Sequence, residues 1–180
     1  MGVYDAIRFF PDYSNEDKIL AYSILGGVPH YLRQFDSNLS LTKNIKQNIL
    51  MKGCTLYSEV DFLLKQELRE TAVYNSIIEA VAMGNTRLNE ISQKSLVEDT
   101  AKTGVYLKNL IKLGIIEREI SVDAGMQERV NKLTDNFFRF WYAFVFNHYS
   151  DLEMGDVDGI YEYVVAKQLH KLASLNFKEV

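Results

Sequence analysis

The sequence predicts a mainly α-helical fold that contains one small antiparallel β-hairpin. Apolar residues recur at helical spacing through most of the 180 residues. The stretch IIEREISV (115–122) differs, because apolar and polar residues alternate there as they do along a half-buried strand. The stretch FFRFWYAFVF (137–146) has aromatic residues in nearly every direction around a helix, so we expect that helix to be packed on both sides.

Composition and charge narrow the class of protein. The hydrophobic fraction of 47% and the charged fraction of 24% are ordinary for a globular chain and argue against disorder. The net charge of −4 gives nucleic acid and anionic membranes no general attraction, so any DNA contact depends on a local patch. One cysteine excludes an intrachain disulfide and a cysteine-rich zinc site. We find no secretory signal and no membrane-spanning run, and expect a cytoplasmic protein without a membrane partner.

Capping residues and glycines divide the first 84 positions into helices. Serine, asparagine and proline favour the start of a helix, and glycine favours its end. The predicted starts are Ser14 or Asn15, Pro29 and Ser40. The predicted ends are Gly26, Gly53 and Gly84. Residues 57–83 read as one long helix or as two abutting helices.

The next part of the chain has the order helix, helix, helix, β-hairpin, which is the order of a winged helix. The three helices are expected at about 70–83, 86–94 and 100–113. The second is predicted to start at Asn85 or Thr86, and the third at Asp99 or Thr100. The wing is expected at about 115–134, with its turn at DAG, residues 123–125.

Three further segments follow the wing. Asp135 or Asn136 is the predicted cap of the aromatic helix. Residues 147–159, NHYSDLEMGDVDG, are polar and acidic and are expected to form a loop. The segment from 160 onward begins another amphipathic helix, which reaches the end of the sequence without a closing cap.

Four stretches occur in an order that resembles one protein family. They are LGGVPHYL (25–32), ELRETAVYNSIIEAVAMGNTRLNEIS (67–92), VYLKNLIKLGIIERE (105–119) and LTDNFFRFWYAFVF (133–146). Together they resemble the region after the ATPase core of the archaeal-type ATPases, AAA+-related proteins of the signal-transduction NTPase group. In that family a P-loop core is followed by a helical lid, a winged helix and a C-terminal domain that resembles a restriction endonuclease.

The resemblance implies a division of the chain into three parts. It implies an AAA+-type lid at 1–68 and a winged helix at 69–136. It implies that 137–180 holds an interdomain aromatic helix, an acidic loop and the truncated start of the C-terminal domain, ASLNFKEV. The chain would then be a fragment whose partners are the missing P-loop core and the missing C-terminal domain.

The same resemblance implies a role without catalysis. No GxxxxGK[ST] element occurs, so no loop of this sequence can cradle phosphates in the P-loop manner. We therefore expect ATP and Mg²⁺ to bind the full-length parent, which the resemblance implies is an ATPase, and not to bind this fragment tightly. No catalytic residue is assigned. The three histidines are dispersed, and no metal site is expected: His30, His148 and His170.

The glycine-proline stretch supplies the expected nucleotide contacts. Gly27-Val28-Pro29 matches the Gly-x-Pro element that lids of this family bring to the nucleotide base. The implied lid residues are Gly26, Gly27, Pro29 and His30. From the residues alone, the favoured interpretation is a helix stop followed by a start with proline in the first turn, and the resemblance reverses that preference. Neither His30 nor Arg33 fits the family's γ-phosphate-sensing arginine well.

A second set of candidate residues is basic and lies in the predicted winged helix. Winged helices often bind DNA through the third helix and the wing. The candidates are Lys102, Lys108 and Lys112 on the helix, and Arg118, Arg129 and Lys132 on the wing. Acidic residues oppose this assignment: Glu98 and Asp99 at the helix start, and Glu117, Glu119 and Glu128 on the wing.

Three functions remain open from the sequence. The first is a lid and winged helix that couple the ATP state to interdomain, partner or DNA contacts. The second is a stand-alone winged-helix regulator that binds DNA. The third is a protein-interaction module, which oligomerises or docks through the aromatic helix.

Overall fold

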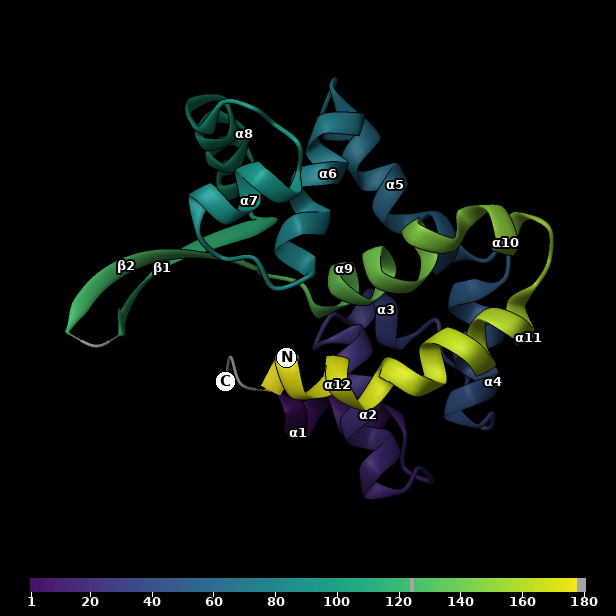
Figure 1. The fold of residues 1–180 in the computed structure, drawn as a ribbon. Coiled ribbons are helices and arrows are strands. Elements are labelled where there is room, and N and C mark those ends of the chain that lie inside the picture. Colours follow the sequence, from purple (N-terminus) through teal and green to yellow (C-terminus); the bar gives the residue numbers. More distant parts are fainter. Residues whose placement is uncertain (124, 178–180) are drawn as a thin grey trace. The chain divides into compact units, whose positions relative to one another are not determined.

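The computed structural model describes residues 1–123 and 125–177 and divides the chain into two compact units (Figure 1). The first unit combines Met1–Leu63 with Phe140–Val180, and the second unit is Leu64–Arg139. Within the described ranges the structure is helical apart from one two-stranded antiparallel sheet. The predicted fold class, mainly α with a small β-hairpin, is confirmed.

Short helices make up the N-terminal part of the first unit. They are α1 (Val3–Ala6), a 3₁₀ turn (Ile7–Phe9), α2 (Asn15–Leu25), α3 (Pro29–Leu32), α4 (Leu41–Ile45), a π-helical turn (Lys46–Leu50) and the start of α5 (Thr55–Glu67). Two predicted caps are confirmed. The Ser14 hydroxyl accepts a hydrogen bond from the Asp17 N–H at 3.1 Å, and the Ser40 hydroxyl accepts one from the Lys43 N–H at 3.2 Å.

The C-terminal part of the chain is also helical. It contains α9 (Asn136–Phe140), a π-helical turn (Trp141–Val145), a 3₁₀ turn (Phe146–His148), α10 (Tyr149–Glu153), α11 (Val157–Ile160), a second π-helical turn (Tyr161–Val165) and α12 (Ala166–Phe177). The Asp135 carboxylate accepts a hydrogen bond from the Phe137 N–H at 2.9 Å, so the predicted start of the aromatic helix is confirmed.

The prediction of a loop at 147–159 is wrong, because α10 and α11 occupy most of that segment. Gly155, with φ of 92°, separates the two helices. Asp156 then caps α11 by accepting a hydrogen bond from the Gly159 N–H at 3.1 Å. The acidic residues that suggested a loop are exposed or cap a helix, and one buried residue, Leu152, anchors α10.

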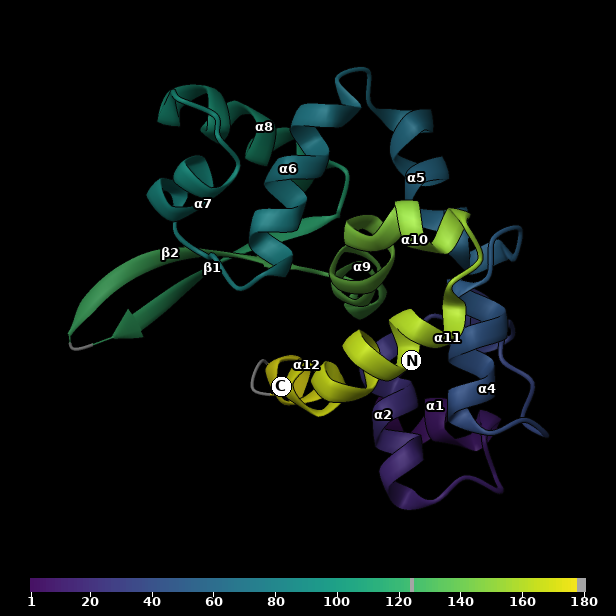
Figure 2. The ribbon, with the colours of Figure 1, turned by 45° about the vertical axis from the view of Figure 1, so that its right-hand side comes forward.

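The last helix of the first unit packs on an early one. Figures 1 and 2 show α12 beside α2, and the Asn176 side-chain amide donates to the Ser23 carbonyl at 2.6 Å. The sequence-based division placed 137–180 in a third part of the chain. In the structure, residues 140–180 instead form one compact unit with 1–63.

The aromatic helix is buried on all sides. Trp141 has no exposed surface, its indole N–H donates to the Tyr57 carbonyl at 2.8 Å, and its ring lies 5.7 Å from the Tyr149 ring. Phe140, Tyr142 and Phe144 are at most 1% exposed. Packing on both sides is confirmed, and these side chains are not available as a docking surface.

The second unit has the element order of a winged helix. Its elements after α5 are α6 (Thr71–Ala82), α7 (Leu88–Lys94), α8 (Thr100–Lys112), β1 (Ile116–Asp123) and β2 (Met126–Leu133). The segment predicted as one helix or two is therefore two helices, with the break at 68–70. The wing turn falls partly on Ala124, which lies outside the described residues.

The start of α7 differs from the prediction. The helix is capped at Arg87, not at Asn85 or Thr86, and the Glu90 carboxylate accepts the Arg87 N–H at 3.3 Å. The reason is a distant contact. The Thr86 carbonyl accepts hydrogen bonds from the backbone and side-chain amides of Asn131 on β2, at 2.9 and 3.0 Å, so this carbonyl is bound to the strand and α7 begins after it.

One face of α8 is buried. Leu107 and Leu110 are fully buried, and Thr103 joins them. Val105 is 59% exposed, because two residues of α-helix turn the side chain by about 200° away from Leu107.

The hairpin extends beyond the three helices of its own unit (Figures 1 and 2). Its base is buried through Ile116 on β1 and Leu133 on β2, which are opposite each other in the register. Ile120 and Val122 are 65% and 69% exposed. The alternating pattern therefore predicts the strand correctly, although the outer aliphatic side chains cover no core of this unit.

Candidate functional sites

The stretch LGGVPHYL (25–32), called the Gly-Pro turn from here on, connects α2 to α3. Its first glycine ends α2 with φ of 60° and ψ of −154°, a conformation essentially restricted to glycine. The Gly26 N–H donates to the Tyr22 carbonyl at 2.8 Å and closes the helix. Pro29 is then the first residue of α3, as predicted from its missing N–H.

The second glycine of the turn is needed for a close approach of backbone. A Cβ atom at Gly27 would overlap the carbonyl oxygen of Met1. The Met1 amino group also donates to the Gly27 carbonyl at 3.1 Å. Gly27 therefore lets the first residues of the sequence lie directly on the Gly-Pro turn.

The turn exposes two side chains to solvent, and the two residues that follow them are buried. Pro29 and His30 are exposed, whereas Tyr31 and Leu32 are 4% and 1% exposed. The His30 Nε2 atom lies 3.3 Å from the Glu59 carboxylate on α5. The structure thus brings together the four predicted lid residues and adds Glu59. Sequence reasoning missed Glu59, because nothing local links it to a histidine 29 positions earlier.

A basic stripe lies on the solvent face of α8. Ala101, Val105, Lys108 and Lys112 are all exposed and are spaced by four, three and four residues, so they share one side of the helix. Lys102 is also exposed and lies to one side of this stripe. The helix itself thus presents the three predicted lysines to solvent.

The N-terminal end of the same helix is acidic. The Asp99 carboxylate caps α8 by accepting the Ala101 N–H at 2.8 Å, and Glu98 is exposed beside it. Asp99 is therefore held as a structural cap. The negative charge at this end opposes close contact with an anionic polymer there, which leaves the stripe along the helix as the basic surface of α8.

The predicted wing cations differ in their surroundings. The Arg118 Nε atom donates to the Asn131 side-chain oxygen at 3.0 Å, which orients the guanidinium on β1. Lys132 lies 3.0 Å from the Glu119 carboxylate and is paired with it. The two residues therefore do not form one basic patch.

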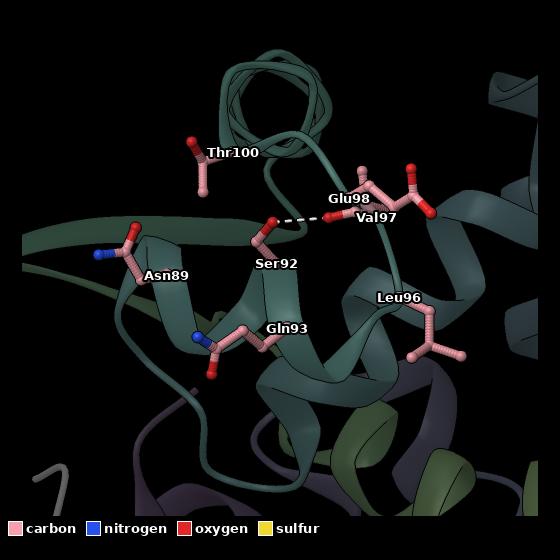
Figure 3. A pocket seen from close by; sticks show the side chains of 7 residues that line it. All are labelled: Asn89, Ser92, Gln93, Leu96, Val97, Glu98 and Thr100. Carbon is pink, nitrogen blue, oxygen red and sulfur yellow. Dashed lines mark hydrogen bonds between the residues drawn. The ribbon is translucent and has the colours of Figure 1, made fainter.

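One open cavity of about 500 Å³ lies between α7 and the start of α8 (Figure 3). Its lining residues are Asn89, Ser92, Gln93, Leu96, Val97, Glu98 and Thr100. The Ser92 hydroxyl donates to the Val97 carbonyl at 2.7 Å and accepts from the Thr103 hydroxyl at 3.2 Å. This serine is engaged in holding the α7–α8 connection and has no acid–base partner in the cavity.

Metal binding and membrane crossing find no support within residues 1–123 and 125–177. No group of three or more His, Cys, Asp or Glu side chains in these ranges is arranged to hold a metal ion. None of the helices described there is long and apolar enough to cross a membrane.

Comparisons with known proteins give one informative similarity. No protein-family model matches the chain, and no solved structure matches it significantly. The uncharacterized protein MJECL04 of Methanocaldococcus jannaschii is 32% identical over 153 residues, which cover 84% of this chain and 34% of the relative. The chain therefore spans about a third of the length of the curated relative that it matches.

Proposed function

We propose that the chain is the lid and winged helix of a P-loop ATPase of the archaeal type, a part that performs no catalysis of its own. Three observations support the proposal. The four sequence stretches keep the order of that family, and the second unit has three helices followed by a hairpin. The chain is also similar to one part of a longer protein.

One observation carries the nucleotide assignment. Pro29 and His30 are exposed directly beside the point where Met1 lies on Gly27. A P-loop core joined to Met1 would be attached next to this turn. Its nucleotide would then meet the proline ring, which offers a flat apolar surface without an N–H group.

The residues around Pro29 hold it in a fixed position, as a contact with a nucleotide base would require. Tyr31 and Leu32 bury the other side of the short helix α3, so the proline is fixed to the body of the first unit. Glu59 lies beside His30 and orients its imidazole. The core would hold ATP and Mg²⁺. The Gly-Pro turn would supply an apolar contact to the nucleotide base, and this contact would form only when nucleotide is bound.

Helix α5 provides a route from the turn to the winged helix. Glu59, the partner of His30, lies on α5, which begins in the first unit and ends in the second. Because α5 has residues in both units, we propose that it carries a movement of one unit to the other. Lid movement on ATP binding would thus change the position of the winged helix.

The test uses the full-length parent, in which the reading frame upstream of Met1 supplies the core. We expect Pro29→Ala to weaken nucleotide affinity and to lower ATP hydrolysis. Pro11→Ala is the matched control, because Pro11 is the other proline of the chain and is also exposed. Equal rates and affinities for the two variants would reject a nucleotide role for the turn. A reading frame without a phosphate-binding loop upstream would reject the whole proposal.

A second candidate function, contact with duplex DNA, is favoured by the stripe on α8. Small apolar residues and two lysines share one exposed helix face, which suits contact with base edges and phosphates in a major groove. Fluorescence anisotropy with duplex DNA at low and physiological salt tests it. Lys108→Ala and Lys112→Ala are each expected to reduce the salt slope by about 1, and Lys94→Ala, an exposed lysine on α7, is the control. Absence of salt-dependent binding at micromolar protein would reject this candidate.

A further inference from the structure

A second open cavity of about 500 Å³ lies beside the break between α5 and α6 (68–70). The end of α5 and the break supply one part of its lining, Tyr74 of α6 supplies a second, and the last turns of α8 supply a third. All of these residues belong to the second unit. Sites for small molecules have volumes of roughly 300–1,000 Å³, so the size of this cavity suits a small ligand.

Hydrogen bonds hold two polar groups of the cavity in fixed positions. The Asn109 side-chain amide donates to the Tyr74 hydroxyl at 2.8 Å, and the Tyr106 hydroxyl donates to the Glu70 carboxylate at 2.6 Å. The rings of Tyr74 and Tyr106 pack edge to face with their centroids 4.9 Å apart. A ligand would therefore meet groups that are already oriented, which lowers the entropic cost of binding.

Charges of both signs line this cavity without being paired to one another. Arg69 and Lys112 supply the positive charges, and Glu67 and Glu70 supply the negative charges. All four side chains are exposed. Within residues 1–123 and 125–177, no ion pair joins any of the four to a side chain of opposite charge. A molecule that carries both a negative and a positive group would complement this lining.

We infer that the cavity binds a small zwitterion of the amino-acid class. The carboxylate of the ligand would bind Arg69 and Lys112, and its ammonium group would bind Glu70, which the Tyr106 hydroxyl holds in place. A simple anion would meet the two glutamates and a simple cation would meet the two basic side chains, so repulsion between like charges disfavours both. The inference goes beyond the proposed function, because no residue of the Gly-Pro turn lines the cavity.

The first test asks whether the ligand needs both charges. The isotopically labelled full chain is titrated with glycine and with γ-aminobutyrate, two zwitterions that differ in the separation of their charges. Acetate and methylammonium, which each carry one charge, are the control probes. We expect a zwitterion at millimolar concentration to shift the amide resonances of residues 67–70 and 109–113. Each control probe should bind about fivefold more weakly, which is the upper end for the loss of one exposed ion pair.

The second test compares side chains that line the cavity with matched side chains outside it. Lys112→Ala removes a cation of the cavity, and Lys108→Ala removes the exposed lysine one turn earlier on α8. Glu70→Gln keeps an acceptor for the Tyr106 hydroxyl but removes the charge, and Glu117→Gln changes an exposed glutamate of β1. We expect Lys112→Ala and Glu70→Gln each to raise the Kd for the zwitterion about fivefold, and the two control variants to leave it unchanged. Circular dichroism of each variant verifies that the chain is folded.

The outcomes separate this inference from the functions proposed above. Contact with DNA would depend on Lys108 and Lys112 alike, whereas zwitterion binding depends on Lys112 alone of the two. If acetate or methylammonium binds as tightly as the zwitterions, the cavity is a simple ion site and the inference is overturned. Absence of shifts with every probe, or equal effects of Lys112→Ala and Lys108→Ala, would overturn it as well. None of these results bears on Pro29→Ala, whose effect on ATP hydrolysis tests the lid independently.

Discussion

Two glycines show how backbone conformation decides the effect of the same substitution. Gly26 has φ of 60° and ψ of −154°, which side chains other than hydrogen rarely allow. We expect Gly26→Ala to lower the free energy of unfolding by about 1–3 kcal/mol. Gly104 lies within α8 with open space where a Cβ would be, so Gly104→Ala should raise it by about 0.5–1 kcal/mol. Urea unfolding should show that the two variants change the free energy of unfolding in opposite directions. Changes in the same direction would contradict this prediction.

Leu96 is a leucine in a left-handed conformation. It has φ of 57° and is 87% exposed, so its side chain gains little from packing. Asparagine tolerates this conformation better, and we expect Leu96→Asn to stabilise the protein by up to about 1 kcal/mol. Val105→Asn is the control, because Val105 is also an exposed aliphatic residue but lies within a regular helix, where valine and asparagine have similar propensities, so we expect little change there. A thermal midpoint that falls for Leu96→Asn would contradict the prediction that the left-handed backbone of Leu96 costs stability.

At the scale of elements, a three-residue clip ties α10 to the start of α5. The Glu153 carboxylate accepts a hydrogen bond from the Tyr57 hydroxyl at 2.7 Å and pairs with the Lys52 ammonium at 2.5 Å. The hydrogen bond from Lys52, followed by that from Tyr57, lowers the pKa of Glu153 below its ordinary value. Folding therefore favours the ionised carboxylate.

The clip makes stability depend on pH in a defined direction. A lowered folded-state pKa stabilises the protein above the unfolded value, about 4.3 for Glu, and the contribution is lost as the pH falls through the folded value. We expect Glu153→Gln to lower the thermal midpoint at neutral pH. The difference in thermal midpoint between the variant and the unsubstituted chain should vanish in acid. A difference that stays constant with pH would exclude the carboxylate as its cause.

Helix boundaries could be predicted where the deciding contact is local. Ser14, Ser40 and Asp99 cap their helices through backbone groups two or three residues away, and the sequence shows such contacts directly. Arg87 replaced the predicted cap because Asn131, 45 positions beyond Thr86, binds that carbonyl. The acidic helices α10 and α11 were missed because the loop was predicted from the polar and acidic composition of 147–159. Such a composition indicates that a segment is exposed to solvent, but it does not determine the backbone conformation.

The candidate sites follow the same division between local and distant causes. The sequence located the Gly-Pro turn and the exposed lysines of α8, since both depend on residues within one element. It did not locate Glu59 beside His30. That contact depends on packing between two segments, which the order of residues alone does not specify.

At the scale of the whole molecule, we propose that the chain is the lid and winged helix of an ATPase whose nucleotide site lies in other sequence. Two compact units share α5, and the Gly-Pro turn is exposed on the first of them. The chain alone should therefore neither hydrolyse nor firmly retain ATP, while the parent should do both.

Hydrogen–deuterium exchange of the parent, with and without ATP, tests this claim most directly. The backbone amides of residues 26–28 and 30–33 should exchange more slowly when ATP is bound, and the amides of the chain on its own should not respond to ATP. An unchanged exchange rate at the turn in an ATP-bound parent, or ATP-dependent protection in the isolated chain, would contradict the account.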